Sequence, residues 1–328
     1  MPKYLLIRFS AIGDIVLTSP VIRSLKQARP DAEVHFLTKA GMAPILAHNP
    51  YIDQLHLLGK DENLWSLAGR LRPEGYDALL DLHGSLRSRT LSLLLQRPRY
   101  GFDKANEQKK RLVRQQPAGS VSHIVTRYGQ VLEPLGIRLD DGGLDFFLPA
   151  ANVSAAESAL REANFDPAPA LAVALGATHA TKRWPVAYFA QTLNQLGRPC
   201  LLLGGKDALN EAAYLRQHLR VPFFDAVGRF DLLTAAALLR SCHDLLTHDT
   251  GFMHIGAAFG MKIYSLWGST VPEFGMTPYK TSFVALETKG LDCRPCSRIG
   301  FDTCPRGHFR CMKDLDPGQV LDVLSSKS

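Results

Sequence analysis

The sequence contains 328 residues, of which 46% are hydrophobic and 21% are charged, and its formal net charge is +7. This length suits two globular domains that each bury a core of their own. The longest apolar runs, such as residues 91–95, are far too short to span a bilayer, which excludes a transmembrane helix. The apolar part of the N-terminus is too short for a signal peptide, so we expect a cytoplasmic protein.

The first half of the sequence alternates between segments typical of strands and segments typical of helices. Residues 4–9 form an apolar run, as expected of a strand that is buried on both faces. Residues 15–29 place apolar side chains at helical spacing. This alternation predicts a parallel sheet with helices on both sides. Further strands are expected at 33–38, 54–58 and 76–81, and further helices at 41–48 and 63–72.

A second series of the same kind follows a stretch of Gly, Pro and small residues at 140–152. Ser154, with Glu157 three residues later, predicts the start of a helix over 154–164. A closing helix is expected from Asp316, and it can pack back on the first domain. We therefore predict an α/β protein of two Rossmann-like, doubly wound parallel-sheet domains that face each other across a cleft, residues 1–152 and 153–315, followed by the helix at about 316–328. Strands of the second domain are expected at 171–175, 199–203, 223–226, 243–246 and 262–266.

The segment Ser10-Ala-Ile-Gly-Asp14 lies where the first strand is followed by a helix. Parallel sheets bind their ligands at this position. The segment lacks the Gly-x-Gly-x-x-Gly pattern of a dinucleotide site. Asp14 is therefore either a helix cap, which gains from the helix dipole, or a catalytic carboxylate.

Three polar loops follow strands of the second domain. Residues 247–254, Thr-His-Asp-Thr-Gly-Phe-Met-His, open a helix of small residues whose backbone N–H groups can face a diphosphate. The alternative is a capped turn with His254 in the core. Lys182 is placed to reach a phosphate, and Gly204 and Gly205 permit a nucleotide to approach the backbone closely. Three such loops in one domain predict a nucleotide site.

Basic residues and cysteines are each concentrated in one segment. Nine Lys or Arg residues lie between positions 87 and 114, against Asp103 and Glu107 as the acids. This segment is either a solvated face or a surface for an anionic partner: a phosphorylated substrate, a membrane or a nucleic acid. Four cysteines near the C-terminus match the spacing of a structural zinc site only in their first pair, and a packed or redox-sensitive clasp is the alternative. These are Cys293, Cys296, Cys304 and Cys311.

Together these motifs resemble glycosyltransferase family 9, which includes the ADP-heptose:lipopolysaccharide heptosyltransferases. The similarity lies in Ile7-Arg-Phe-Ser-Ala-Ile-Gly-Asp-Ile-Val-Leu-Thr-Ser-Pro20, in Lys182-Arg-Trp-Pro185 and in Asp249-Thr-Gly-Phe-Met-His-Ile-Gly-Ala-Ala258. The cysteine-rich tail is similar to that of members of the heptosyltransferase II type. The resemblance covers essentially the whole chain, with its motifs in the right order.

The resemblance implies a GT-B fold, with the acceptor bound by the N-terminal half and the nucleotide sugar by the C-terminal half. It also implies inverting transfer that needs no metal or other cofactor. Asp14 matches the general base of the family. The donor-binding positions implied are Lys182, Asp249, Thr250, Gly251, Met253, His254, Gly204, Gly205 and Asp207, with Glu211 as an alternative to Asp207 for the ribose. The acceptor-binding positions expected are Ser10, Gly13, Arg97, Arg99, Lys109, Lys110 and Arg111.

The expected substrates follow from the same resemblance. The donor is expected to be ADP-heptose, and the acceptor an anionic glycolipid of the lipopolysaccharide core and lipid A. The protein would then contact the inner face of the inner membrane peripherally and bind no nucleic acid. Two alternatives stay open: another GT-B enzyme such as a sugar-nucleotide epimerase, which needs further acid–base residues, and a non-catalytic nucleotide-sugar binding protein.

Overall fold

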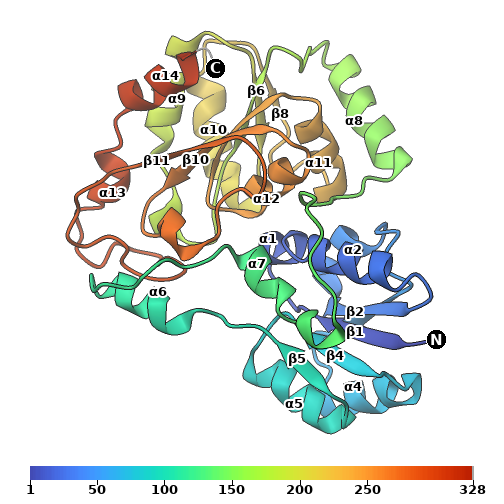
Figure 1. Ribbon diagram of the computed structural model, residues 1–328. Coiled ribbons are helices and arrows are strands. Elements are labelled where there is room, and N and C mark those ends of the chain that lie inside the picture. The colour runs from blue at the N-terminus through green and yellow to red at the C-terminus, as the bar shows by residue number, and fades with distance from the viewer. Residues whose placement is uncertain (327–328) are drawn as a thin grey trace. The chain divides into compact units, whose positions relative to one another are not determined.

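The structure, a computed structural model, describes residues 1–326 and divides into two α/β units (Figure 1). The first unit consists of residues 1–106 and 122–147, and the second of residues 107–121 and those from 148 onward. The chain therefore changes unit close to the predicted boundary, but the segment 107–121 differs from the prediction because it belongs to the second unit. In that unit Gln115 donates a hydrogen bond from Nε2 to the carbonyl oxygen of Arg294 (2.6 Å). Among the described residues, no helix is both long and apolar enough to cross a membrane.

Five parallel strands form the sheet of the first unit: β1 (Lys3–Ile7), β2 (Glu33–Lys39), β3 (Gln54–Leu58), β4 (Ala78–Asp81) and β5 (Arg99–Gly101). Their order across the sheet is β3-β2-β1-β4-β5. Central β1 is apolar because helices cover it on both faces, and its Leu5, Leu6 and Ile7 are fully buried. The predicted parallel sheet is thus confirmed, and only the short edge strand β5 was not expected.

Helices lie on both faces of this first sheet (Figure 1). On one face, α4 (Leu64–Leu71) and α5 (Leu86–Leu95) pack Leu67 and Leu91 against Leu5 and Leu79 of the strands. On the other face, α2 (Ser19–Ala28) contacts α7 (Ile124–Gly129). Short helices α1 (Ile12–Val16) and α3 (Ala43–Leu46) follow β1 and β2. The helix expected at 41–48 is shorter in the structure, because residues 40–42 form a 3₁₀ turn.

The second unit has a sheet of six parallel strands: β6 (Leu171–Ala174), β7 (Cys200–Leu203), β8 (Phe223–Asp225), β9 (Asp244–His248), β10 (Lys262–Trp267) and β11 (Phe283–Glu287). The order across the sheet is β11-β10-β9-β6-β7-β8, which is the Rossmann order of two halves wound outward from the first strand. The five strands predicted from the sequence are all present. The edge strand β11 is an addition.

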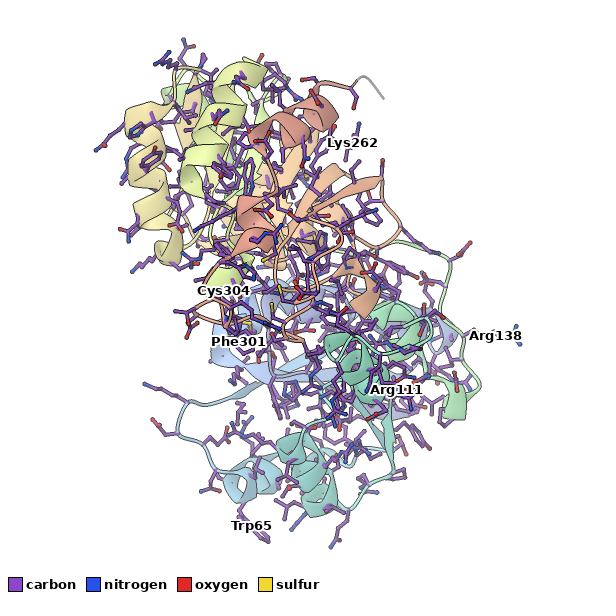
Figure 2. The ribbon with its side chains drawn as sticks, turned by 90° about the vertical axis from the view of Figure 1, so that its left-hand side faces the viewer. Trp65, Arg111, Arg138, Lys262, Phe301 and Cys304 are labelled. Carbon is purple, nitrogen blue, oxygen red and sulfur yellow. The ribbon has the colours of Figure 1, made fainter. Side chains whose placement is uncertain are left out.

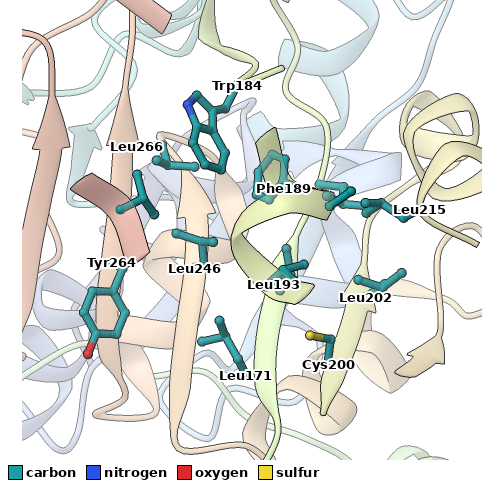
Figure 3. Packing of buried hydrophobic residues seen from close by; sticks show 14 of the residues in the cluster. Leu171, Trp184, Phe189, Leu193, Cys200, Leu202, Leu215, Leu246, Tyr264 and Leu266 are labelled. Atoms are coloured by element: carbon teal, nitrogen blue, oxygen red, sulfur yellow. The ribbon is translucent and has the colours of Figure 1, made fainter. Parts of the chain in front are cut away.

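Two helical layers cover this second sheet (Figure 1). One consists of α9 (Val186–Leu196), α10 (Leu209–His218) and α14 (Pro317–Ser325), and the other of α8 (Ala150–Glu162), α11 (Leu232–Arg240) and α12 (Gly251–Ala258). Figure 3 shows the core between the first layer and the strands, where Trp184, Phe189 and Leu193 meet Leu246 and Leu266. The remaining helices are α6 (Asn106–Val113) and α13 (Arg310–Lys313).

The sequence had allowed the closing helix α14 to pack back on the first domain. In the structure α14 belongs to the second unit. Its Val320 and Leu324 are buried in the core of the second unit, where α14 packs along α9. Thr192 of α9 also donates a hydrogen bond to the carbonyl oxygen of Pro317 (3.4 Å). The apolar stripe of α14 is therefore used within its own unit, which removes the reason for it to return to the first. The helix expected from Ser154 begins earlier than predicted, since Pro149 precedes its first turn.

Candidate functional site

Each sheet has a point where the strand order reverses. The residues predicted to act in catalysis or donor binding follow the strands that meet there. In the first unit this point lies between β1 and β4, and in the second between β6 and β9. Loops that leave two such neighbouring strands run to opposite faces of the sheet, which opens a crevice for a ligand. Asp14 follows β1, Lys182 follows β6 and Asp249 follows β9. The three residues therefore lie at the ligand-binding edges of their own sheets.

Asp14 lies in the first turn of α1 and is held there by Arg8. The Arg8 guanidinium reaches Asp14 Oδ2 at 2.7 Å, and it also donates to the carbonyl oxygens of Ser10 (2.8 Å) and Leu82 (2.7 Å). The buried Tyr128 ring lies 5.8 Å from the same guanidinium. Arg8 is thus fixed on several sides and orients the carboxylate. Sequence reasoning missed this role, because Arg8 lies within what appeared to be a purely apolar strand.

The loop after β4 brings a second group of side chains to the edge of the first sheet that also carries Asp14. The buried carboxylate of Asp81 accepts hydrogen bonds from the backbone N–H groups of His83 (3.0 Å) and Gly84 (2.8 Å) and from Ser88 Oγ (3.0 Å). Burial, together with the charges of Arg8 and Lys104, lowers the pKa of His83 to about 4. Its Nδ1 is buried and has no hydrogen-bond partner among residues 1–326. His83 is therefore a neutral imidazole with one ring nitrogen that a ligand can still engage.

The expected acceptor-binding cations are divided between the two units. Arg99 binds the buried Asp81 through Nε (2.9 Å), which makes it part of the support for the loop after β4. Arg97 is exposed in the first unit. Lys109, Lys110 and Arg111 lie on α6, which is grouped with the second unit, and Figure 2 labels Arg111 on that helix. Of the remaining two expected positions, Ser10 supplies only its carbonyl oxygen to Arg8, and Gly13 lies in the first turn of α1.

Lys182 and Asp249 meet in the second unit. Lys182 Nζ lies 2.6 Å from Asp249 Oδ2, and Thr270, which follows β10, donates to the same oxygen (3.0 Å). Thr250 precedes α12, whose first turn begins at Gly251. A helix start with a nearby ammonium group suits a phosphate, because its N–H groups and dipole favour negative charge. Thr270 was missed from the sequence, although Gly-Ser-Thr after an apolar strand is the same signal that identified the other loops.

His248 connects two of these loops from within the core. Its Nε2 accepts the backbone N–H of Trp184 (2.9 Å), so the ring proton lies on Nδ1, which donates to the carbonyl oxygen of Gly176 (3.1 Å). Burial, partly offset by the Gly176 hydrogen bond, lowers the pKa of His248 to about 4. The neutral ring fixes the loop that carries Lys182 against the end of β9, directly before Asp249.

The other expected donor-binding residues fall into two groups. Arg183 reaches both candidate ribose acids, Asp207 at 3.1 Å and Glu211 at 2.7 Å, so the two carboxylates share one cation. Gly204 serves the packing of its loop, because a Cβ there would lie 2.8 Å from the Cβ of Ala208. Gly205 begins the short turn that carries Asp207. Met253 and His254 are buried in α12, as expected of core side chains.

The comparison with known proteins agrees with this geometry. The model of glycosyltransferase family 9 (heptosyltransferase) matches residues 64–302. The chain belongs to glycosyltransferase family 9. It is 28% identical to lipopolysaccharide heptosyltransferase 1 of Pseudomonas aeruginosa, over 97% of this chain and 93% of that protein. Two solved structures share its fold: a family 9 glycosyltransferase from Veillonella parvula (TM-score 0.82, 20% identity, 98% of this chain and 96% of that one) and Escherichia coli ADP-heptose lps heptosyltransferase II (TM-score 0.72, 20% identity, 98% and 97%). The predicted GT-B class is thereby confirmed.

In this family 9 glycosyltransferase the cysteine-rich segment supports the loops that carry Lys182 and Thr270. Arg294 donates to the carbonyl oxygens of Gly268 (2.7 Å) and Thr270 (3.1 Å), and the N–H of Cys296 donates to Ser269 (3.1 Å). Thr181, next to Lys182, exchanges hydrogen bonds with the backbone of residue 301 in the same segment.

The four cysteines of that segment lie near enough to influence one another: after burial, Cys293 and Cys304 add to the raised pKa of Cys296, and these three add to the raised pKa of Cys311. Cys293 Sγ lies 3.7 Å from His308 Nε2, and burial raises the pKa of Cys311 to about 12. Cys296 is half-buried and its pKa is also raised, again chiefly by burial. Within residues 1–326, the group of three or more ligand-type side chains with mutually close ligand atoms is a different one, His35, His56 and Glu74.

Proposed function

We propose that this family 9 glycosyltransferase transfers heptose from ADP-heptose to an acceptor of the lipopolysaccharide inner core. The observation that carries the proposal is the Arg8–Asp14 pair at the carboxyl end of β1, at a strand-order reversal where a substrate hydroxyl can bind. The names of the relatives support the choice of sugar and acceptor. The family assignment itself favours a transferase over the epimerase and the non-catalytic binding protein.

The proposed reaction is a single displacement. Asp14 Oδ2 contacts Arg8 and accepts from the N–H of Ala11 (3.3 Å), and the buried Tyr128 hydroxyl also interacts with this carboxylate. The carboxylate held in this way receives the proton of the acceptor hydroxyl. That hydroxyl oxygen bonds to the anomeric carbon while the bond from this carbon to the diphosphate oxygen breaks. ADP leaves with the electron pair, and the configuration at the anomeric carbon inverts.

Donor binding is assigned to Lys182 and the start of α12 in the second unit. Charge on the departing diphosphate is met by the Lys182 ammonium and by the N–H groups after Thr250, which are fixed before the reaction starts. Because Lys182 and the helix start supply positive charge, we infer that a divalent cation is not needed at the leaving group. Peripheral contact with the inner membrane would follow from the glycolipid acceptor.

The test is an Asp14→Asn variant, which keeps the shape of the side chain and removes the base. We expect kcat to fall by about 100-fold or more, because general base catalysis contributes about 10²–10⁴. The affinity for ADP should not change, since Asp14 lies in the first unit. Asp31→Asn, at an exposed carboxylate of the same unit, is the matched control and should be fully active. Turnover of Asp14→Asn close to that of the wild type would refute the proposed base.

A further inference from the structure

A group of buried polar side chains lies in the first unit, apart from the Asp14 crevice. His35 lies on β2 and His56 on the neighbouring β3, and both imidazoles are at most 5% exposed. Tyr76 and Glu74 precede β4, so the group gathers toward the end of the sheet where β4 begins. Asp14, in contrast, follows the carboxyl end of β1. None of the roles assigned above involves these four residues.

Three of their polar atoms form a tight triangle. His35 Nδ1 lies 3.1 Å from His56 Nε2, and Tyr76 Oη lies 3.0 Å from each of the two nitrogens. A neutral imidazole nitrogen either donates or accepts, so the contact between the two nitrogens requires one of each kind. The acceptor nitrogen has no hydrogen, which leaves one N–H and one O–H for three contacts. Two hydrogens therefore serve three contacts, and the triangle is incompletely satisfied as a hydrogen-bond network.

A carboxylate completes the group. Glu74 Oε2 lies 4.0 Å from His35 Nδ1, and the ligand atoms of His35, His56 and Glu74 all lie within 4.8 Å of one another. Two imidazoles on a tetrahedral zinc ion, with Zn–N bonds of about 2.0–2.1 Å, hold their nitrogens about 3.3 Å apart. The observed 3.1 Å is close to this value. Glu74 is partly exposed and offers a path by which an ion can enter.

We propose that His35, His56 and Glu74 form a binding site for a divalent transition-metal cation such as Zn²⁺. The ion takes a lone pair from each imidazole and an oxygen from Glu74, which relieves the shortage of hydrogens in the triangle. Lys3 now donates to Glu74 (3.2 Å) and also pairs with Glu33 (2.7 Å), so it can release Glu74 and stay paired. The site ties together β2, β3 and the segment before β4, and its role is structural.

The experiment loads the full-length chain with Zn²⁺, removes excess ion by dialysis and measures bound metal per chain. The variants His56→Gln and Glu74→Gln each remove one ligand, and His48→Gln changes an exposed histidine of the same unit as the control. We expect the wild type and the control to retain one equivalent of Zn²⁺ at this site. The two variants should lose it, because their affinity for Zn²⁺ is lowered by about 100-fold. The melting temperature of the wild type should rise with Zn²⁺, and those of the variants should not.

The absorption spectrum of bound Co²⁺ distinguishes metal at this site from metal bound by the four cysteines. Co²⁺ bound by nitrogen and oxygen ligands shows visible d–d bands without an intense near-ultraviolet band, whereas thiolate ligands add a charge-transfer band in the near ultraviolet. The equivalent lost in the variants should be one without that band. Metal content that is the same in the wild type and both variants, or that is wholly of the thiolate type, would overturn the proposal. Far-UV circular dichroism checks folding, and Glu74→Gln, at a partly exposed side chain, serves if His56→Gln does not fold.

Discussion

Lys182 is paired with an anion of its own chain at the place where it is proposed to bind the anion of the donor. Its ammonium group lies 2.6 Å from Asp249, which also accepts the hydroxyl of Thr270. The ammonium group also donates to the carbonyl oxygen of Asp249 (3.4 Å), so Asp249 holds Lys182 in one position and one hydrogen remains for a phosphate. A lysine fixed in this way loses little side-chain entropy when the ligand arrives.

The variant Lys182→Ala should bind ADP more weakly by about tenfold or more, because hydrogen bonds to charged groups contribute about 1.5–3 kcal/mol. Binding of adenosine, which has no phosphate, should hardly change. Isothermal titration with both ligands measures the difference. Lys289→Ala, at an exposed lysine of the same unit, should bind both ligands like the wild type. Equal losses for ADP and adenosine would contradict the placement of Lys182 at the diphosphate.

The burial of His248 makes stability depend on pH in a defined direction. Its folded pKa is about 4, against an ordinary value of 6.5, and the groups that face it are the Gly176 carbonyl, the Trp184 N–H and the charges of Arg183, Lys182 and Asp249. Between these two values the unfolded chain binds a proton that the folded chain does not, so stability falls as the pH falls from about 6.5 toward 4.

We expect the free energy of unfolding to drop by about 2 kcal/mol for His248 alone between pH 7 and pH 5. His56 and His83, whose pKa values are also lowered to about 4 by burial, add changes of the same sign. Urea unfolding across this range measures the slope. The exposed-site variant His48→Gln should keep the slope. A flat profile from pH 7 to pH 5 would show that these rings are protonated without cost in the folded protein.

Among the helices and strands, α6 is notable for its basic residues, which can bind an anionic partner. Lys110 and Arg114 of the α6 region line a cavity of about 250 Å³ together with residues 296–298 of the cysteine-rich segment. Within residues 1–326, Arg111 pairs with Glu107 at the long distance of 3.8 Å, which leaves much of its charge to a partner. A helix with cations on an exposed face attracts an anionic glycolipid or membrane surface by about 1 kcal/mol for each residue.

Replacing Lys109, Lys110 and Arg111 together with Ala should therefore raise the acceptor KM by about 100-fold at low salt. Donor KM should stay unchanged, and high salt should produce much of the same loss in the wild-type protein, because salt screens exposed charges. Steady-state kinetics with a phosphorylated glycolipid acceptor measures both effects. If the triple variant uses that acceptor as well as the wild type at low salt, the charges of α6 only face solvent.

The elements show clearly what a sequence can and cannot predict. Strands buried on both faces, such as β1 and β6, form unbroken apolar runs and were predicted within a few residues. The edge strand β5 was missed because Arg99-Tyr-Gly is short and has no apolar run. The edge strand β11 does contain an apolar run, Phe283-Val-Ala-Leu286, and sequence reasoning overlooked this signal. The unit to which α6 belongs depends on contacts with residues nearly two hundred positions away, and no local pattern contains them.

For the whole molecule, the sequence predicted which loops carry the candidate residues but not which residues hold those loops in place. Asp14, Lys182 and Asp249 were predicted because polar residues after parallel strands gather at one edge of a sheet. His248 and the hydrogen bonds of Arg294 were missed, since each acts through atoms that are distant in the sequence. Arg8 is close to Asp14 in the sequence and was missed because it falls in an apolar run. Placement of a loop is predictable from the strand before it. The partners that hold the loop in place are set by tertiary packing.

Chelation tests the two inferences about metals in one protein. Turnover is expected to persist in excess EDTA, because Lys182 and the start of α12 supply the positive charge at the leaving group. The melting temperature should fall in the same solution if zinc had occupied the site at His35 and His56. Activity that is lost with EDTA and restored by magnesium or manganese would contradict the proposed mechanism and leave the zinc site untouched.

The assignment of residues 107–121 to the second unit has a consequence for engineering. The chain passes between the units three times, after residues 106, 121 and 147, so no single cut separates them. A chimera with a relative that is joined once near residue 148 would combine α6 from one parent with the cysteine-rich segment from the other, and Gln115 would face a foreign Arg294 loop. Exchange of the donor-binding half between family members therefore requires three junctions, with α6 transferred as part of that half.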